Sequence, residues 1–145
     1  MTLVYVATRF GDYERASHAA DLLRRAGHAG SATWLDIAKK LRGRCSAIPV
    51  GAIRRTYHAL QDLEDVRRAS AFVLILPPEG GAGCYCELGS ALTLSKRCLV
   101  VGALQPSPIF LELCELYRTP EEAIEALSEP ELEPELEPEL EPEPD

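Results

Sequence analysis

Short apolar runs alternate along this chain with longer segments in which apolar residues recur at every third or fourth position. The runs "LVYVA" (3–7), "AFVLIL" (71–76) and "RCLVVGAL" (97–104) are aliphatic and β-branched, which predicts strands. The second run is apolar throughout, as is typical of a strand in the middle of a parallel sheet. The segments "HAGSATWL" (28–35) and "ELCELYR" (112–118) are weaker strand candidates. The pattern therefore predicts five strands.

The segments between these runs have helical spacing. Residues 12–27 predict a helix that ends at Gly27, a residue suited to a helix C-terminus. Residues 36–48 are basic and irregular, which indicates a loop or a short helix. Pro49 suits the first turn of a helix of about five turns over residues 50–69. Its apolar stripe consists of Ile53, Tyr57, Leu60, Leu63 and Val66.

Two more helices follow the third strand. Residues 84–96 predict a helix whose buried side is Leu88, Ala91, Leu92 and Leu94. The last helix opens with Thr119, then Pro120, and Glu122 three residues after the Thr, which is a capping-box pattern.

Strands that alternate with helices of ten or more residues favour a parallel sheet with right-handed crossovers and helices on both faces. The expected fold class is therefore α/β, in a single domain. Ligands of such folds bind at the carboxyl ends of the strands.

The chain has 145 residues, a length that fits one domain, and a formal net charge of −8. Nine of its 23 acidic residues lie in 128–145, which leaves 14 acidic against 15 basic residues in 1–127. The tail repeats "EPEL", and a Pro at every fourth position prevents a helix while like charges repel. We therefore expect a folded domain over 1–127 and a disordered, extended tail over 128–145. The tail is read either as solubilising or as a docking segment for a basic partner.

Several classes of protein are disfavoured by these properties. The nearly neutral body has no basic stripe of the kind that nucleic-acid binders carry. The apolar runs are too short to span a bilayer, and "MTLVYVATRF" has no secretory-signal pattern. The five cysteines, an odd number without such a signal, indicate reduced thiols in a cytoplasmic protein. Cys84 and Cys86 have no second pair at metal spacing, so we expect no zinc site.

The stretch "GAGCYCELGSAL" (81–92) places one carboxylate, Glu87, where a helix begins after a central strand. We expect Glu87 in the first helical turn, at the ligand-binding edge, where the helix dipole favours its ionised form. An ionised Glu beside a glycine-lined pocket can act as a nucleophile. Glu is also common in first helical turns for the dipole alone, so the position does not establish catalysis.

Five segments together resemble the nucleoside 2-deoxyribosyltransferase-like family in their order and spacing. They are "LVYVATRF", "RRAGHAGSATWL", "DLEDVRRASAFVLIL", "GAGCYCELGSALTLSKRCLVVG" and "PSPIF". The likeness covers about Leu3 to Leu127, and "ELG-x-A" after a strand is its most specific element. The resemblance implies a flavodoxin-like or Rossmann-like fold, a homo-oligomer, and no metal or organic cofactor.

By position, the resemblance implies roles for three residues. Glu87 resembles the family's nucleophile, Tyr5 the strand tyrosine that hydrogen-bonds it, and Asp62 the acid near the nucleobase. Asp65, one turn further on, is interpreted as structural. The substrate-binding candidates are Arg9 for a 5′-phosphate, Phe10 and Trp34 for base stacking, and the glycines Gly81 and Gly83. Tyr5, Asp62, Arg9 and the two aromatic residues could equally have packing or surface roles.

Three departures from the family pattern are visible. Gly81 stands where members acting on nucleosides tend to carry Asp and members acting on monophosphates tend to carry Ser. Ser70 replaces an acidic residue before the third strand, and the bulky Tyr85 is expected to fill part of the pocket.

The sequence thus predicts an enzyme that cleaves or transfers the N-glycosidic bond of a (deoxy)nucleoside or its 5′-monophosphate through a glycosyl-enzyme. The rival hypothesis is a nucleotide-sensing module that kept the pocket and lost turnover. Gly81 and Tyr85 favour the rival, whereas Glu87, Asp62 and Tyr5 together disfavour it. Transfer and hydrolysis share the first half-reaction, so the sequence leaves that choice open.

Overall fold

The computed structural model describes residues 1–41, 52–103 and 108–131 of the chain. Within these ranges the elements are β1 (Leu3–Ala7), the 3-10 helix η1 (Phe10–Asp12), α1 (Tyr13–Arg25), β2 (Ala29–Gly30), α2 (Thr33–Leu41), α3 (Ala52–Arg68), β3 (Ala71–Ile75), α4 (Ala82–Thr93), β4 (Arg97–Val101), the 3-10 helix η2 (Ile109–Leu113), β5 (Glu115–Tyr117) and α5 (Pro120–Leu127).

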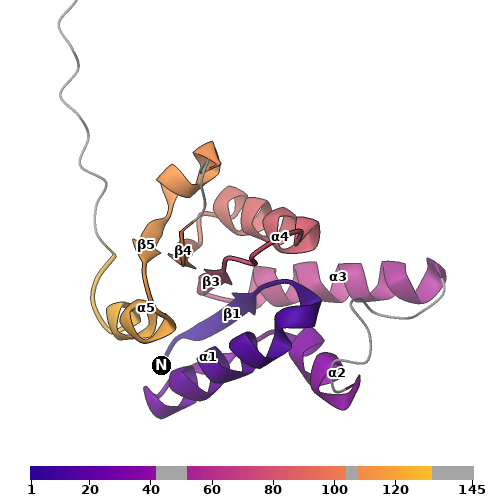
Figure 1. The fold of residues 1–145 in the computed structure, drawn as a ribbon, viewed down its shortest axis with the longest axis horizontal. Helices are drawn as coiled ribbons and strands as arrows, with labels where there is room; N and C mark the ends of the chain where they lie inside the picture. The colour runs from indigo at the N-terminus through magenta and orange to yellow at the C-terminus, as the bar shows by residue number, and fades with distance from the viewer. Residues whose placement is uncertain (42–51, 104–107, 132–145) are drawn as a thin grey trace, which may run out of the picture.

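The strands form one parallel sheet in the order β2-β1-β3-β4-β5. Helices α1 and α5 pack together on one face of the sheet, and α3 and α4 pack together on the other (Figure 1). The chain leaves β1 toward β2 and returns past it to β3, so the strand order reverses between β1 and β3. This is the flavodoxin-like arrangement, and its reversal point is where ligands bind in such sheets. The predicted α/β fold is confirmed.

The core lies between the sheet and its two helical layers. Every residue of β3 is buried, as the continuous apolar run predicted, because helices cover both faces of a central strand. Tyr5 of β1 is fully buried beside Phe72 of β3, and the two rings stack with centroids 5.6 Å apart. The central strands are thus a rigid base for whatever lies at their carboxyl ends.

The second strand and the helix after it differ from the prediction. Only Ala29 and Gly30 pair with β1, and the chain is helical from Thr33. The Thr33 amide and hydroxyl both donate to Asp65, at 2.9 and 2.7 Å, so a side chain from α3 holds the start of α2. The irregular segment predicted over 36–48 is helical to Leu41. Pro49 and Cys45 lie outside the described residues.

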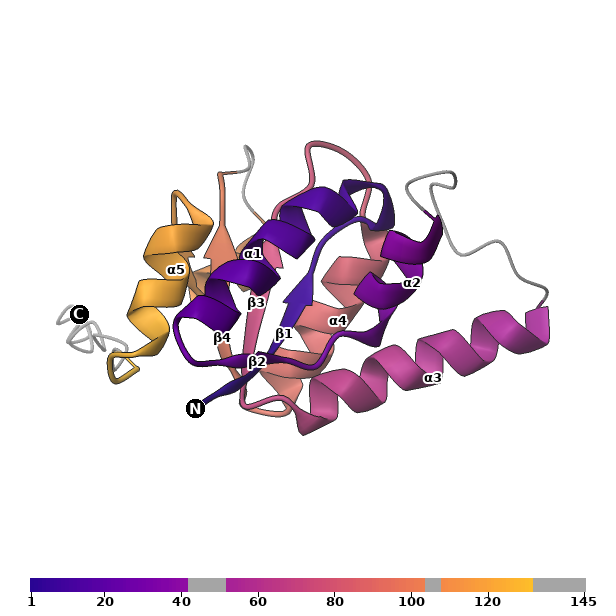
Figure 2. The same cartoon turned by 90° about the horizontal axis from the view of Figure 1, so that it is seen from below.

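Helix α3 exposes most of the apolar stripe that the spacing identified. Val66 is buried, but Tyr57, Leu60 and Leu63 are 63%, 62% and 44% exposed. Figures 1 and 2 show the reason, because the N-terminal part of α3 runs past the edge of the sheet. Periodicity therefore predicted the helix correctly and did not predict which turns would find a packing partner.

The ends of the other helices were largely predicted. Gly27 follows α1 with φ +84°, and Thr119 caps α5 by accepting from the Glu122 amide at 3.2 Å. The prediction that Leu94 is buried was wrong. Helix α4 ends at Thr93, and Leu94 is 46% exposed.

Some further expectations concern what the chain lacks. No helix in the described ranges has the length and apolarity to cross a membrane. The same ranges hold no cluster of three metal-ligating side chains, and their four cysteines are free thiols. Most of the predicted tail, 132–145, lies outside the description.

Candidate active site

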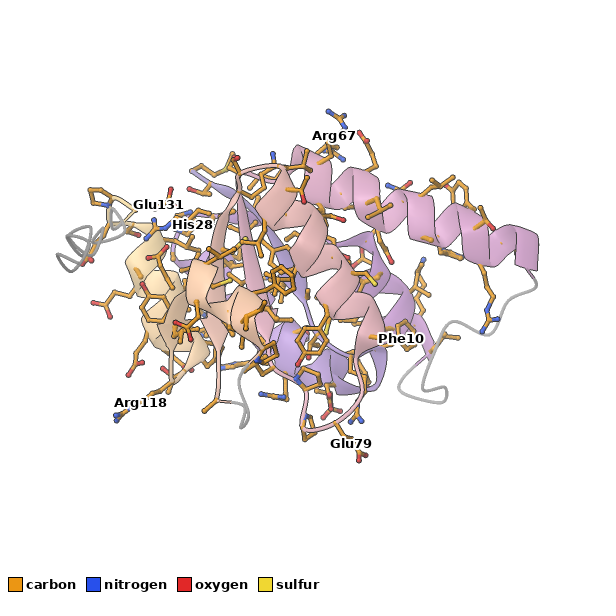
Figure 3. All side chains as sticks on the ribbon, turned by 90° about the horizontal axis from the view of Figure 1, so that it is seen from above. Phe10, His28, Arg67, Glu79, Arg118 and Glu131 are labelled. Atoms are coloured by element: carbon orange, nitrogen blue, oxygen red, sulfur yellow. The ribbon has the colours of Figure 1, made fainter. Side chains whose placement is uncertain are left out.

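A cavity of about 370 Å³ opens at the carboxyl ends of β1 and β3, within the range typical of small-molecule sites. Its walls come from the β1–η1 turn, α2, α3 and the start of α4. The lining residues are Thr8, Arg9, Phe10, Trp34, Arg55, His58, Ala59, Asp62, Gly81, Gly83, Cys84 and Glu87. Figure 3 shows Phe10 and Glu79 at this edge and Arg67 on the opposite side of the molecule.

Glu87 and Tyr5 meet at this edge. The Tyr5 phenol, from β1, donates a hydrogen bond to Glu87 Oε2, from α4. The contact is possible because β1 and β3 are neighbours, so that the helix after β3 packs over β1. The predicted convergence of these two side chains is confirmed, and their catalytic roles remain predictions.

The charge of Glu87 differs from the expectation. Helix α4 begins at Ala82, so Glu87 lies in its second turn, beyond the first turn to which the effect of the helix dipole is largely confined. Burial raises the pKa of Glu87 to about 8, and the Tyr5 hydrogen bond opposes that rise. The carboxyl is thus held close to the point where it gains or loses its proton near neutral pH.

Asp62 of α3 supplies the second carboxyl of the cavity. It is half-buried, and no described residue gives it a hydrogen bond. Burial, with a smaller contribution from the charge of Asp65, raises the pKa of Asp62 to about 7. The charge of Asp62 in turn contributes to the raised pKa of Glu87. Two carboxyls with raised pKa values in one cavity are a common basis of acid–base and nucleophilic chemistry.

Asp65 is structural in position, as the sequence indicated. It is completely buried, and it accepts from Gln61 at 3.0 Å in addition to the two bonds from Thr33. These bonds fix α2 against α3. They thereby place Trp34, the residue after Thr33, in the cavity wall.

Arg9 lines the cavity, but its positive charge is already paired with a carboxylate. Its guanidinium donates two hydrogen bonds to the Asp12 carboxylate, at 3.1 and 3.2 Å, and one to the Glu79 carbonyl at 3.3 Å. A phosphate at Arg9 would have to compete with Asp12 for the same donors.

The two candidate stacking residues form one aromatic wall. The rings of Phe10 and Trp34 lie 6.1 Å apart at 47° to each other, an ordinary tilted pair. Trp34 is only 5% exposed, and its indole N–H donates to the Val6 carbonyl at 3.0 Å. The wall therefore combines a packing role with an apolar surface toward the cavity.

The glycine-rich turn before α4 forms the opposite wall. Gly81 has φ +84°, and a Cβ there would lie 2.6 Å from Pro77 Cγ, so this position cannot carry a side chain without a shift. A Cβ on Gly83 would meet nothing within 4 Å. Burial raises the pKa of Cys84 to about 12, which keeps this cavity-lining thiol protonated and makes it a poor nucleophile.

Tyr85 does not fill the cavity, contrary to the prediction. Its side chain lines a second, apolar cavity of about 440 Å³ behind α4, together with Pro77, Leu88 and Phe110. Helical geometry explains the difference, because residues two apart on a helix point in different directions. One of the two features that favoured a sensing module is thereby removed.

The structure brings the candidate site residues together, and it adds others that the sequence reasoning missed. Thr8, Arg55, His58, Ala59 and Cys84 also line the cavity. Arg55, His58 and Asp62 are spaced three and four residues apart on a predicted helix, so the helical period could have identified that face. No pattern in the sequence identified Thr8. Its place depends on a contact between two neighbouring strands, in which the Thr8 hydroxyl donates to the Ile75 carbonyl at 2.9 Å.

Comparison with solved structures shows two enzymes with this fold. A 2-deoxyribosyltransferase from Bacillus psychrosaccharolyticus superimposes with a TM-score of 0.60 and 18% identity, over 83% of this chain and 88% of the enzyme. The CMP N-glycosidase of Clostridium botulinum superimposes with a TM-score of 0.53 and 13% identity, over 87% of this chain and 98% of that one. At these identities the likeness shows a shared fold. It matches, at that level, the family resemblance seen in the sequence.

No protein-family model matches the chain, and a comparison with curated proteins gave no match either.

Proposed function

We propose that the protein cleaves or transfers the N-glycosidic bond of a (deoxy)nucleoside or nucleoside 5′-monophosphate, with Glu87 as the nucleophile. The observation that carries this proposal is the Tyr5–Glu87 hydrogen bond at the wall of a cavity that also contains Asp62. The two enzymes with the same fold, a 2-deoxyribosyltransferase and a CMP N-glycosidase, support the type of bond.

In the first step, the ionised Glu87 attacks the anomeric carbon of the sugar. The bond from that carbon to the base nitrogen breaks, and its electron pair leaves with the base. Asp62 donates its proton to the departing base. Because the pKa of Glu87 is about 8 and that of Asp62 about 7, the reactive form, with the charge on Glu87 and the proton on Asp62, is the less populated of the two singly protonated forms. The product is a neutral base and a glycosyl ester of Glu87, as in a retaining glycosidase.

In the second step, a water molecule or an N–H nitrogen of another base attacks the same carbon, its proton passes to the Asp62 carboxylate, and Glu87 leaves as a carboxylate. Tyr5 acts on Glu87 in both steps, because its phenol stabilises the carboxylate that attacks and later departs. Burial raises the pKa of Tyr5 far above its usual value, so the phenol remains a donor throughout.

The test is release of free base from a panel of nucleosides and 5′-monophosphates, measured by chromatography on the full chain. Glu87→Gln keeps the shape and the bond from Tyr5 but removes the charge, so base release should fall by on the order of a thousandfold or more. A 2-fluoro sugar analogue should add its mass to the peptide that contains Glu87.

Equal turnover by wild type and Glu87→Gln would refute the nucleophile. The second candidate function is a nucleotide-sensing module, which Gly81 favours because the site lacks the Asp or Ser that the family pattern places there. Wild type that binds nucleotides and releases no base from any of them would establish that alternative.

A further inference from the structure

One face of α3 carries polar side chains that the proposed mechanism does not use. Asp62, His58 and Arg55 recur at steps of four and three residues, and all three line the active-site cavity together with Ala59. From Asp62, His58 lies one helical turn away, about 6 Å along the axis, and Arg55 two turns away, about 10 Å. Asp62 has a role as the proton donor, whereas His58 and Arg55 have none so far.

These two side chains are also free to bind a ligand. Within the ranges that the structure describes, neither the Arg55 guanidinium nor either His58 ring nitrogen has a hydrogen bond or an ion pair, although both residues line the cavity. Arg9, the other cation of the cavity, is held by Asp12. The His58 ring packs edge-on against Tyr57, with centroids 5.6 Å apart, which steadies its orientation without using its nitrogens.

The geometry of the displacement indicates which part of the substrate this face of α3 contacts. A nucleophile attacks the anomeric carbon from the side opposite the departing base. Glu87 lines the cavity from α4, and most other side chains of the wall come from the β1–η1 turn, α2 and α3. The base therefore lies on the far side of the sugar, toward α3 and the aromatic wall of Phe10 and Trp34. His58 and Arg55 therefore contact the base further from the sugar than the base atom that receives the proton of Asp62.

The polar groups on this wall are mainly donors. Arg has five N–H donors and no acceptor, a neutral imidazole has one N–H donor and one acceptor nitrogen, and an Asp that acts as a proton donor offers its O–H. The Trp34 indole N–H is already used by the Val6 carbonyl, and Ala59 adds only a methyl group. A base edge that presents acceptors therefore complements this wall, and an edge that presents an amino group places donor against donor.

We propose, on the basis of the proposed function, that Arg55 and His58 form a base-recognition subsite for leaving bases with an exocyclic oxygen. Such bases are the 6-oxopurines and the 2,4-dioxopyrimidines. Their amino counterparts, 6-aminopurine and 4-aminopyrimidine bases, are disfavoured because the exocyclic amino group turns its own N–H donors toward the donor that would bind the oxygen, and that donor loses its water without gaining a partner. Arg55 and His58 are specificity residues here, and the bond-breaking steps remain those of Glu87 and Asp62.

The experiment compares substrates that differ at one position of the base: deoxyinosine with deoxyadenosine, and deoxyuridine with deoxycytidine. Both pairs are supplied as nucleosides and as 5′-monophosphates, and kcat/KM for base release is measured with the full chain. The wild type should favour the oxo member of each pair by about tenfold or more. Arg55→Ala and His58→Ala should bring this ratio toward one by slowing the oxo substrates.

Arg54→Ala is the matched control, because Arg54 is the exposed neighbour of Arg55 on α3 and does not line the cavity. It should leave the ratio unchanged, and thermal melts should show that all three variants fold. A preference for the amino bases, or a ratio that neither Arg55→Ala nor His58→Ala alters, would overturn the subsite.

Failure of the proposed function is distinguishable from failure of the subsite. If wild type releases no base from any substrate, binding of free hypoxanthine and adenine is measured by ligand-observed NMR. Stronger binding of hypoxanthine that is lost in Arg55→Ala would support the subsite without catalysis. Equal binding of the two bases, or no binding of either, would refute it.

Discussion

At the scale of single residues, burial determines the charge of the two carboxyls in the cavity. Glu87 and Asp62 both have raised pKa values, about 8 and about 7, and burial is the largest cause for each. A nucleophile must be ionised and an acid protonated, so the reactive form has the charge on Glu87 and the proton on Asp62. Because the two groups share a cavity, the observed titration steps belong to the pair.

Burial of Glu87 has a consequence for stability that does not depend on catalysis. Folding raises the pKa of its carboxyl from 4.5 to about 8. The contribution of the protonated carboxyl to the stability of the fold is therefore fully present below about pH 4.5 and is lost as the pH rises through about 8. Glu87→Gln removes this loss. It should unfold at a higher temperature than wild type at about pH 9, and the gain should disappear at about pH 4.5.

Thermal unfolding of both proteins across this pH range is the measurement. Glu121→Gln is the control, because the hydrogen bond from His18 lowers the pKa of the exposed Glu121 and a gain at high pH is not expected there. A gain for Glu87→Gln that is independent of pH would show that Glu87 is not the titrating group.

The Tyr5 phenol is predicted to set the pH at which base release begins. Tyr5→Phe removes the bond that lowers the pKa of Glu87, and a hydrogen bond to a charged group is worth about 1.5–3 kcal/mol. The rising limb of kcat/KM against pH should therefore move upward by about one to two units.

The control is Tyr13→Phe, because the Tyr13 hydroxyl donates to the exposed Glu14, at 3.5 Å, and its loss should leave the profile unchanged. An unshifted limb in Tyr5→Phe would mean that the phenol does not act on the charge of Glu87.

At the scale of elements, Gly81 and Gly83, which were both candidates for substrate binding, differ in whether the position can accept a side chain. Gly81→Ala should destabilise the fold by about 2 kcal/mol or more, since φ +84° is strained for alanine and the new Cβ meets Pro77. Gly83→Ala, in the first turn of α4 with open space around it, should be neutral or stabilise by up to about 1 kcal/mol. Urea denaturation of the two variants measures the difference, and equal effects would contradict this geometry.

At the same scale, α2 and α3 show what the spacing of apolar residues predicts and what it does not. The pattern predicted α3 and its apolar stripe, but three of the stripe residues are exposed because the helix extends past the sheet. The pattern missed the start of α2, which depends on the bonds from Thr33 to Asp65, 32 positions away. Local spacing predicts that an element forms. Its boundaries and packing depend on partners distant in sequence.

At the scale of the whole molecule, Arg97 joins β4, β5 and the end of α5. Its guanidinium forms two hydrogen bonds with Glu115, at 2.7 and 2.9 Å. It also donates to the carbonyls of Ala126 and Glu129, at 3.0 and 2.7 Å. The residues just after α5 are therefore hydrogen-bonded to the sheet as far as Glu129, whereas the domain boundary predicted at 127 remains a prediction.

Two truncations test where the domain ends. Removal of 132–145 should leave the melting temperature within about 2 °C, because the EPEL repeat has no apolar face to bury. Removal of 128–145 should lower it by a few degrees more, since the bond from Arg97 to Glu129 is worth about 1 kcal/mol. A large loss after the shorter truncation would show that the tail docks on the domain.

The sequence by itself determined the order of strands and helices, because a strand and a helix differ in period and each can be recognised within a few residues. It also singled out Glu87, Tyr5 and Asp62, through a resemblance in spacing. Only the tertiary structure decided that burial, and not the helix dipole, sets the charge of Glu87, and that Tyr85 faces away from the cavity. It also showed that His58 and Arg55 line the same cavity as the two carboxyls. The physical reason is that burial, electric field and cavity shape arise from α2, α3 and α4 together, whereas a local pattern describes one element at a time.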